Sequence, residues 1–289
     1  MNSDRRPDHN THRTLRQLVA VEAWYVQSPT DEKRFTLHAA VSFDEERLGG
    51  GSNSTVTFKL SIKKCEIVFL PPISGYFAVD PASVRFTKPP NPHAVQSTQA
   101  TTKTGGFGFK LGLKGKTPEV SANAEASAQR DTTTTVTSNQ TVGPFHELTK
   151  RSREGQRAWS IDGKSQPNGR IWGAIWDANE EPRLTVIDKR PPEVARKDEE
   201  NDFPPISRIE VRCLRADIDI YDIEFKDPQD QGWLASQATG ITKIKAAEAF
   251  LKHAILDEGL TVGDLSDRYS ELTICDVTVP IHDQSALDR

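Results

Sequence analysis

The sequence has few cysteines and no long apolar run. Its 289 residues include three cysteines, which lie far apart and form no CxxC pair. This number and spacing argue against a disulfide framework and favour a reducing compartment. No run approaches the ~20 apolar residues of a membrane helix, and residues 1–16 lack the apolar stretch of a secretory signal. We therefore expect a cytoplasmic protein.

An excess of basic charge is also missing. The formal net charge is −4 and the pI is about 6.0, whereas a dedicated nucleic-acid-binding domain is usually basic. We therefore expect no nucleic-acid partner. The hydrophobic content of 35% is low for a globular chain, which predicts long polar loops around a core.

The familiar catalytic and cofactor-binding motifs are absent as well. The sequence contains no GxSxG, GxxxxGK[ST] or GxGxxG motif and no HxxxH or HxH spacing. The glycines of residues 105–108 do not join a strand to a helix, so they predict no phosphate site. We predict no cofactor and no metal, and we favour a protein that is not an enzyme.

Acidic residues gather in one late segment of the chain. Asp217 and Asp219 share a face of a predicted strand, and further acids follow at Asp222, Glu224 and Asp227. Such acids can bind calcium, and paired acids can hydrolyse glycosides. A solvated strand face is the favoured interpretation, and a carboxylate-based hydrolase is kept as an alternative.

Apolar residues alternate with polar ones along much of the chain, which predicts strands. Clear examples are residues 35–43 and 56–62. The alternation changes phase at Lys63-Lys64 and again after Cys213. Such a change indicates a bulge, or a corner where one strand serves two sheets. Residues 171–176 are apolar on both faces and predict a central strand with Trp172 and Trp176 on one face. Core packing is favoured over a sugar-stacking platform for these tryptophans.

The C-terminal region has a helical period instead. Its apolar positions, spaced by three and four residues, are Ile241, Ile244, Ala247, Leu251 and Ile255. They predict an amphipathic helix that ends near Gly259, and Thr261 with Asp264 predicts a short second helix. A last strand is expected over residues 272–281, whereas residues 189–205 are charged and proline-rich and predict a surface loop.

Together these patterns predict a mainly β protein, an antiparallel two-sheet β-sandwich of roughly ten to twelve strands with a small C-terminal helical appendage. Residues 1–14 are predicted to be a disordered tail. Residues 15–226 are predicted to form the sandwich domain, and residues 227–289 the appendage with its final strand.

One segment hints at a mechanism. Residues 106–128 alternate twice around a break at residues 116–119, which predicts a β-hairpin with two unlike faces. If Leu113 faces Val120, each large side chain of the first strand opposes a small one, mostly alanine. The candidate residues for contact with a membrane or a partner are Phe107, Phe109, Leu111, Leu113, Lys110, Lys114 and Lys116.

With its threonine-rich arms, the hairpin spans residues 101–138 between two long polar loops. It resembles in kind the insertion hairpins of β-pore-forming proteins, in pattern alone and without a family signature. This resemblance implies strands long enough to cross a bilayer, with lysines that approach anionic lipid. Two adjacent strands of a soluble sheet, or an edge that docks a partner strand, explain the pattern too.

Three hypotheses for the function follow. The first is a non-enzymatic binding or interaction module whose partner is a protein or a second copy of the chain. The second is a membrane-inserting, pore-forming-type β protein that uses residues 101–138, with membrane contact through this hairpin alone. The third is the carboxylate-based hydrolase.

Overall fold

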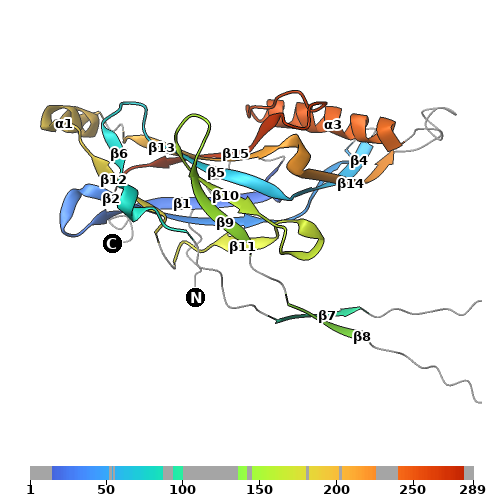
Figure 1. The fold of residues 1–289 in the computed structure, drawn as a ribbon. Helices are drawn as coiled ribbons and strands as arrows, with labels where there is room; N and C mark the ends of the chain where they lie inside the picture. The colour runs from blue at the N-terminus through green and yellow to red at the C-terminus, as the bar shows by residue number, and fades with distance from the viewer. Residues whose placement is uncertain are drawn as a thin grey trace, which may run out of the picture. The chain divides into compact units, whose positions relative to one another are not determined.

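The fold is mainly β with antiparallel sheets, as predicted (Figure 1). The computed structural model describes residues 15–51, 54, 56–86, 94–99, 136–141, 145–179, 182–201, 204–225 and 240–282. Within these ranges, two α-helices and three sheets form the main body, and a further pair of strands forms a separate compact unit.

The first sheet has the long strand β2 at its centre. In order, its strands are β1 (Val19–Ser28), β2 (Asp31–Phe43), β12 (Leu184–Asp188) and β6 (Phe77–Val79), with β11 (Gly173–Trp176) beside β2. From Phe35 to Phe43, every second residue of β2 is buried. The predicted alternation of a sheet with one wet face is therefore confirmed at this strand.

The second sheet also has five strands. In order, they are β15 (Glu271–Pro280), β13 (Ile206–Leu214), β5 (Lys64–Leu70), β10 (Arg157–Asp162) and β9 (His146–Arg151). Buried side chains join it to the first sheet. The Tyr25 hydroxyl of β1 lies 2.8 Å from Ser207 Oγ of β13, and the rings of Trp159 and Trp176 meet edge to face at 5.1 Å. The two sheets therefore share one core.

The third sheet continues from the second one through two corners. It contains β14 (Ile218–Phe225), β4 (Val56–Ile62) and β3 (Glu46–Gly49), in that order. At Lys63 the chain passes from β4 into β5, and the short 3₁₀ turn Arg215–Asp217 joins β13 to β14. The Lys63 amide donates a hydrogen bond to the Asp217 carbonyl at 2.8 Å. The corner predicted from the phase change at Lys63 is therefore present, and a second one lies beside it.

Helix α3 (Gly240–Asp257) covers the third sheet. It lies over β14 and β4 in Figure 1, where the rings of Phe58 and Phe250 meet edge to face at 5.9 Å. The predicted helix is confirmed, and Gly259 follows it with a φ of 74°. Of the five predicted apolar positions, Ala247, Leu251 and Ile255 are buried, whereas Ile241 and Ile244 near the start of the helix are exposed.

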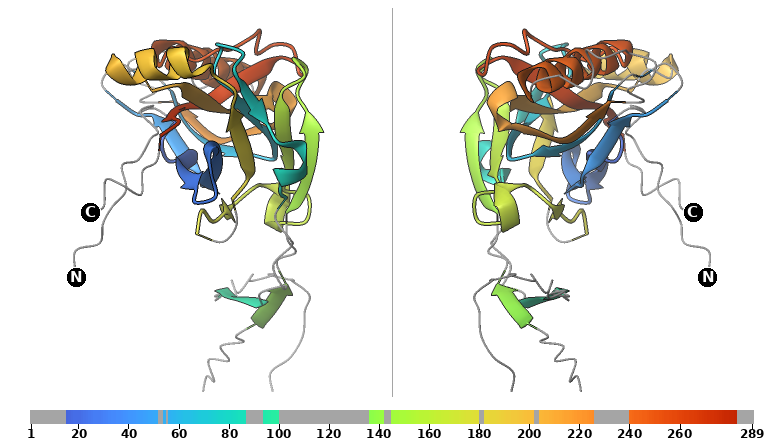
Figure 2. Two further views of the ribbon diagram at one scale, coloured as in Figure 1. Left: turned by 90° about the vertical axis from the view of Figure 1, so that its left-hand side faces the viewer. Right: turned by 90° about the vertical axis from the view of Figure 1, so that its right-hand side faces the viewer.

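Other expectations are wrong or only partly met. The segment predicted as a surface loop contains helix α1 (Pro192–Glu200), which begins on a proline at its first turn and buries no residue. Figure 2 shows α1 and α3 on the same side of the body. The second short helix is replaced by turns around residues 264–269. The strand expected at residues 272–281 is β15, and it pairs with β13. A sandwich of two sheets alone is not confirmed, because the strands of the body form three sheets.

Candidate functional site

The predicted hairpin lies largely outside the described residues, but its base is described. Strands β7 (Ala94–Gln99) and β8 (Val136–Thr141) pair antiparallel with each other and, among the described strands, with no other. They form a compact unit apart from the body. In sequence, they interrupt the body between the 3₁₀ turn Pro81–Ser83 and β9. Strands β7 and β8 are therefore not part of the three sheets of the body.

The candidate residues themselves fall between β7 and β8. Phe107, Phe109, Leu111, Leu113, Lys110, Lys114 and Lys116 all lie outside the described residues. The register of the base is nonetheless defined. Ala94 is opposite Thr141 and Gln99 is opposite Val136, with an unbroken one-to-one pairing between them. The last residue of β7, Gln99, and the first residue of β8, Val136, are thus directly opposed.

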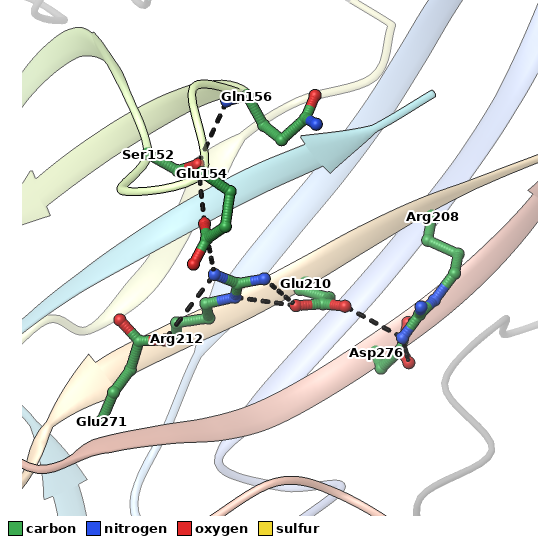
Figure 3. Close-up of polar contacts among 8 residues, drawn as sticks. All are labelled: Ser152, Glu154, Gln156, Arg208, Glu210, Arg212, Glu271 and Asp276. Atoms are coloured by element: carbon green, nitrogen blue, oxygen red, sulfur yellow. Dashed lines mark hydrogen bonds and ion pairs between the residues drawn. The ribbon is translucent and has the colours of Figure 1, made fainter. Parts of the chain in front are cut away.

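A charged array on one face of the second sheet is the most organised polar feature of the described body (Figure 3). Glu210 and Arg212 lie two residues apart on β13, with Arg212 Nη2 2.7 Å from Glu210 Oε2. Arg208 Nη2 approaches the other Glu210 oxygen at 2.9 Å. Glu154, from the turn between β9 and β10, reaches Arg212 Nη1 at 3.0 Å. We call these residues, with Asp276 and Glu271 of β15, the Arg212 array.

The array covers apolar residues that are not part of the central core. Lys150, Ala158, Val68, Glu210 and Asp276 are directly opposed across five neighbouring strands and so share one face. Val68 and Ala158 are buried in this row. Two apolar residues are therefore buried on the same face of the sheet as the charged array, with Glu210 opposite Val68.

Burial and ion pairing have opposite effects on the pKa values of the array. Burial alone would lower the pKa of Arg212, but its hydrogen bonds to Glu210 and Glu154 outweigh that effect and raise the pKa. The pKa of Glu154 is lowered, first by its own backbone amide and then by Ser152 and Arg212. Both shifts favour the charged forms of Arg212 and Glu154. Four carboxylates pair with the guanidinium groups of Arg208 and Arg212. The pair between Glu154 and Arg212 joins the β9–β10 turn to β13.

A cavity of about 260 Å³ lies beside the array. The charged residues that line it are Lys64, Glu66, Lys150, Arg212, Asp217 and Glu271. Glu66 is paired with Lys150 and Arg212 with its own carboxylates. Burial raises the pKa of Asp217, although nearby lysines partly compensate. The cavity therefore carries mixed charge.

Asp217 and Asp219, which were predicted to share a strand face, lie in different elements, and Asp227 lies outside the described residues. Asp217 belongs to the corner turn rather than to a strand. Asp219 accepts hydrogen bonds from Arg170 Nε and Nη2 at 3.0 and 2.7 Å, and it pairs with Lys63 at 3.2 Å. Asp222 lies at a bulge with a φ of 50°. The side chain of Asp219 is 26% exposed, and its carboxylate neutralises two cations.

The two tryptophans predicted to share a strand face have different environments. Trp176 is buried, but Trp172 is 57% exposed and precedes β11. Gly173 has a φ of 79°, and the register shifts between Ala174 and Trp176. The predicted strand is present as β11, but the left-handed backbone at Gly173 leaves Trp172 outside it. Among the described strands β11 pairs with β2 alone, so the prediction of a central position is wrong.

The described residues contain no arrangement that suits a metal ion. No three His, Cys, Asp or Glu side chains gather as ligands within the described ranges. His38 stacks on Trp24 with ring centroids 5.7 Å apart, and its Nδ1 lies 2.9 Å from the Ala178 carbonyl. This histidine packs as part of the first sheet.

The sequence contained a signal for the Arg212 array that was not recognised. Apolar Ile209, Val211 and Cys213 alternate in the sequence with Arg208, Glu210 and Arg212, which form the opposite face of β13. Charges of alternating sign at a spacing of two residues suit an ion-paired sheet face. The partners from β15 and from the β9–β10 turn, however, come together only in the fold.

Comparisons with protein families and with curated protein sequences give no indication of the function. No protein-family model matches the chain, and no curated protein sequence matches it. Among the helices that the structure describes, none combines the length and hydrophobicity needed to cross a bilayer.

Proposed function

We propose that the protein is a non-enzymatic interaction protein in which the insertion between residues 94 and 141 is the element that contacts the partner. The observation that carries the proposal is the pairing of β7 with β8 alone among the described strands, in a unit apart from the body. The scaffold is then a two-layer β-sandwich of the five-stranded sheets, with the three-stranded sheet and α3 at one end.

We propose a lipid membrane as the partner, and the register of the base supports this choice. Each opposed pair of β7 and β8 has residue numbers that sum to 235. Continued without a bulge, this register would oppose Leu113 with Ala122 and Phe107 with Ala128. That is two positions from the pairing with Val120 expected from the sequence, and a shift of two keeps every side chain on its predicted face.

A hairpin of this kind would not enter a bilayer alone. A two-stranded ribbon has two edges with unpaired backbone groups, and lipid offers these groups no hydrogen bonds. Ribbons from several copies of the chain would have to close into a barrel, since closure removes the edges. The proposal therefore includes self-association on the membrane.

Dye release from anionic liposomes tests the proposal. We expect the full chain to release the dye and a chain without residues 106–128 to release none. Phe109→Asp places a charge on the proposed lipid face, where a charge is unfavourable near the bilayer centre, and should abolish release. The matched control Ser121→Asp lies on the polar face and should retain it. Equal release by all four proteins would contradict the proposal.

Paired cysteines test the register. Leu111→Cys with Ala124→Cys follows the sum of 235 and should form a disulfide readily under mild oxidation. Leu111→Cys with Ala122→Cys follows the pairing expected from the sequence and should cross-link less. The three native cysteines are buried in the body, so they interfere little. A preference for the second pair would contradict the extended register.

Two alternatives to membrane insertion are considered beside these experiments. Docking of a partner protein strand on an edge of β7 or β8 predicts no dye release and a stable complex of defined stoichiometry. The carboxylate-based hydrolase is the weaker alternative, since Glu210, Asp219 and Glu66 are each held in an ion pair. No cofactor forms part of either alternative.

A further inference from the structure

Two of the three cysteines occupy opposed positions on neighbouring strands, although they are far apart in the sequence. The ladder between β13 and β5 pairs Val211 with Ile67 and Arg212 with Glu66. One residue further along, Cys213 falls opposite Cys65. Both side chains are buried on the core face, 3% and 1% exposed, and both thiols are free.

The hydrogen bonds to the flanking strands, β10 and β15, show whether Cys65 and Cys213 form a hydrogen-bonded or a non-hydrogen-bonded pair. The Gly163 amide donates to the Lys63 carbonyl at 2.9 Å. Two residues along the same ladder, Ile161 and Cys65 are therefore also a hydrogen-bonded pair. The backbone N–H and C=O groups of Cys65 thus point toward β10 and away from β13.

The same argument holds on the other side of β13. The Arg215 amide donates to the Ser270 carbonyl at 2.8 Å, and two residues along this ladder Cys213 is opposite Leu272. The backbone groups of Cys213 point toward β15. Cys65 and Cys213 are therefore a non-hydrogen-bonded pair, in which the side chains approach most closely. The Cα atoms of such pairs lie about 4.5 Å apart, within the ~4.4–6.8 Å range of disulfides.

We propose that Cys65 and Cys213 are a modification site, a cross-strand dithiol that a disulfide-class oxidant converts into an intrachain disulfide. With oxidised glutathione, one protein thiolate attacks the oxidant and releases one glutathione. The second protein thiolate attacks the mixed disulfide and releases another. The two thiols lose two protons and two electrons, and one oxidised glutathione becomes two molecules of glutathione.

The fold determines when this reaction occurs. Burial raises the pKa of both thiols, which keeps them protonated and slow to react in the folded body. Oxidation therefore takes place while β5 and β13 are apart, during folding or opening of the sheet. The resulting bond ties the two strands beside the corners at Lys63 and Arg215.

Mass spectrometry of the full chain tests the proposal. The protein is refolded with a mixture of oxidised and reduced glutathione, alkylated and digested with trypsin. Cleavage after Lys64 and Arg212 gives separate peptides 65–85 and 213–215, and Cys275 falls in peptide 269–289. We expect peptide 65–85 linked to peptide 213–215, an intact mass lower by two hydrogens, and a higher Tm that a reductant reverses.

Variants separate this pair from the third cysteine. Cys275→Ser should retain the linked peptides, and Cys65→Ser should lose them. A link to peptide 269–289, adducts with glutathione alone, or three alkylated thiols after refolding would each overturn the proposal. Because peptide mapping of the native sequence decides between these outcomes, the test does not depend on the folding of a variant. It is also independent of any contact with a membrane.

Discussion

Arg212 is the counter-ion of a buried carboxylate, because its guanidinium lies 2.7 Å from Glu210, which is 6% exposed. Both residues point to the same side of β13, and Arg208 holds the other oxygen of Glu210. The array therefore depends on charge balance within one short stretch of strand.

Removal of Arg212 alone should lower the free energy of unfolding more than removal of both Arg212 and Glu210. Arg212→Met leaves Glu210 buried beside a single arginine, and we expect a loss of about 3 kcal/mol in the free energy of unfolding. The double variant Arg212→Met with Glu210→Met should recover most of that loss. Urea denaturation measures both. Lys164→Met is the control, since Lys164 is 81% exposed in its pair with Asp162, and it should change stability by less than ~0.5 kcal/mol. An equal loss in the single and double variants would contradict the argument.

Asp219 should contribute to acid sensitivity. Burial alone would raise the pKa of Asp219, but hydrogen bonds from Arg170 and Lys63 outweigh it and lower the pKa below 3.8. A carboxyl group with a lower pKa in the folded state stabilises the fold above its ordinary pKa, and this contribution is lost as the pH falls through the folded pKa. We expect the urea midpoint of the native protein to fall more steeply than that of Asp219→Asn between about pH 4 and pH 2. Parallel pH profiles would rule this out.

Glu46 should have the opposite dependence. Burial raises the pKa of Glu46, although the amides of Gln17 and Leu18 donate hydrogen bonds to its carboxylate. A raised pKa adds stability that is complete below the ordinary pKa and is lost as the pH rises through the folded pKa. Relative to Glu46→Gln, the native protein should therefore gain stability as the pH falls from neutral toward 4.5. Denaturation at several pH values measures the difference, and a constant difference would refute the prediction.

Gly49 should tolerate no side chain. Its φ is 85°, and an added Cβ would lie 1.9 Å from the Val56 carbonyl oxygen. We expect Gly49→Ala to lose at least ~2 kcal/mol, because backbone strain adds to the clash. Gly75→Ala is the matched control, since Gly75 has a φ of 73° with open space around it. It should lose only the ~1 kcal/mol of the left-handed conformation. Equal losses in thermal or urea unfolding would show that the clash does not matter.

The sequence predicts well those elements in which the spacing of apolar residues shows which face is buried. Strand β2 has a period of two because one face packs on the core, and α3 has a helical period for the same reason. The corner at Lys63 was visible because the buried face changes there. Each of these signals is local, so no knowledge of a partner strand was required.

The elements that were missed depend on backbone breaks or distant partners. Helix α1 buries no residue, so it has no apolar period, and its two initial prolines suggested a loop. Trp172 seemed to continue a strand, but the left-handed Gly173 separates it. The Arg212 array brings together three segments, and the opposition of Cys65 and Cys213 requires the register of β5 with β13. The hairpin residues 106–128 lie outside the described ranges, so their predicted pairing stays a prediction.

The two neighbouring corners have a consequence for how the body comes apart. The segments β4–β5 and β13–β14 each run through two sheets and pair with each other on both sides of the bend. A slip of one residue in either segment would turn buried side chains outward in both sheets at once. The second and third sheets can therefore neither slide nor unfold independently of each other. We expect the body to unfold in one cooperative step.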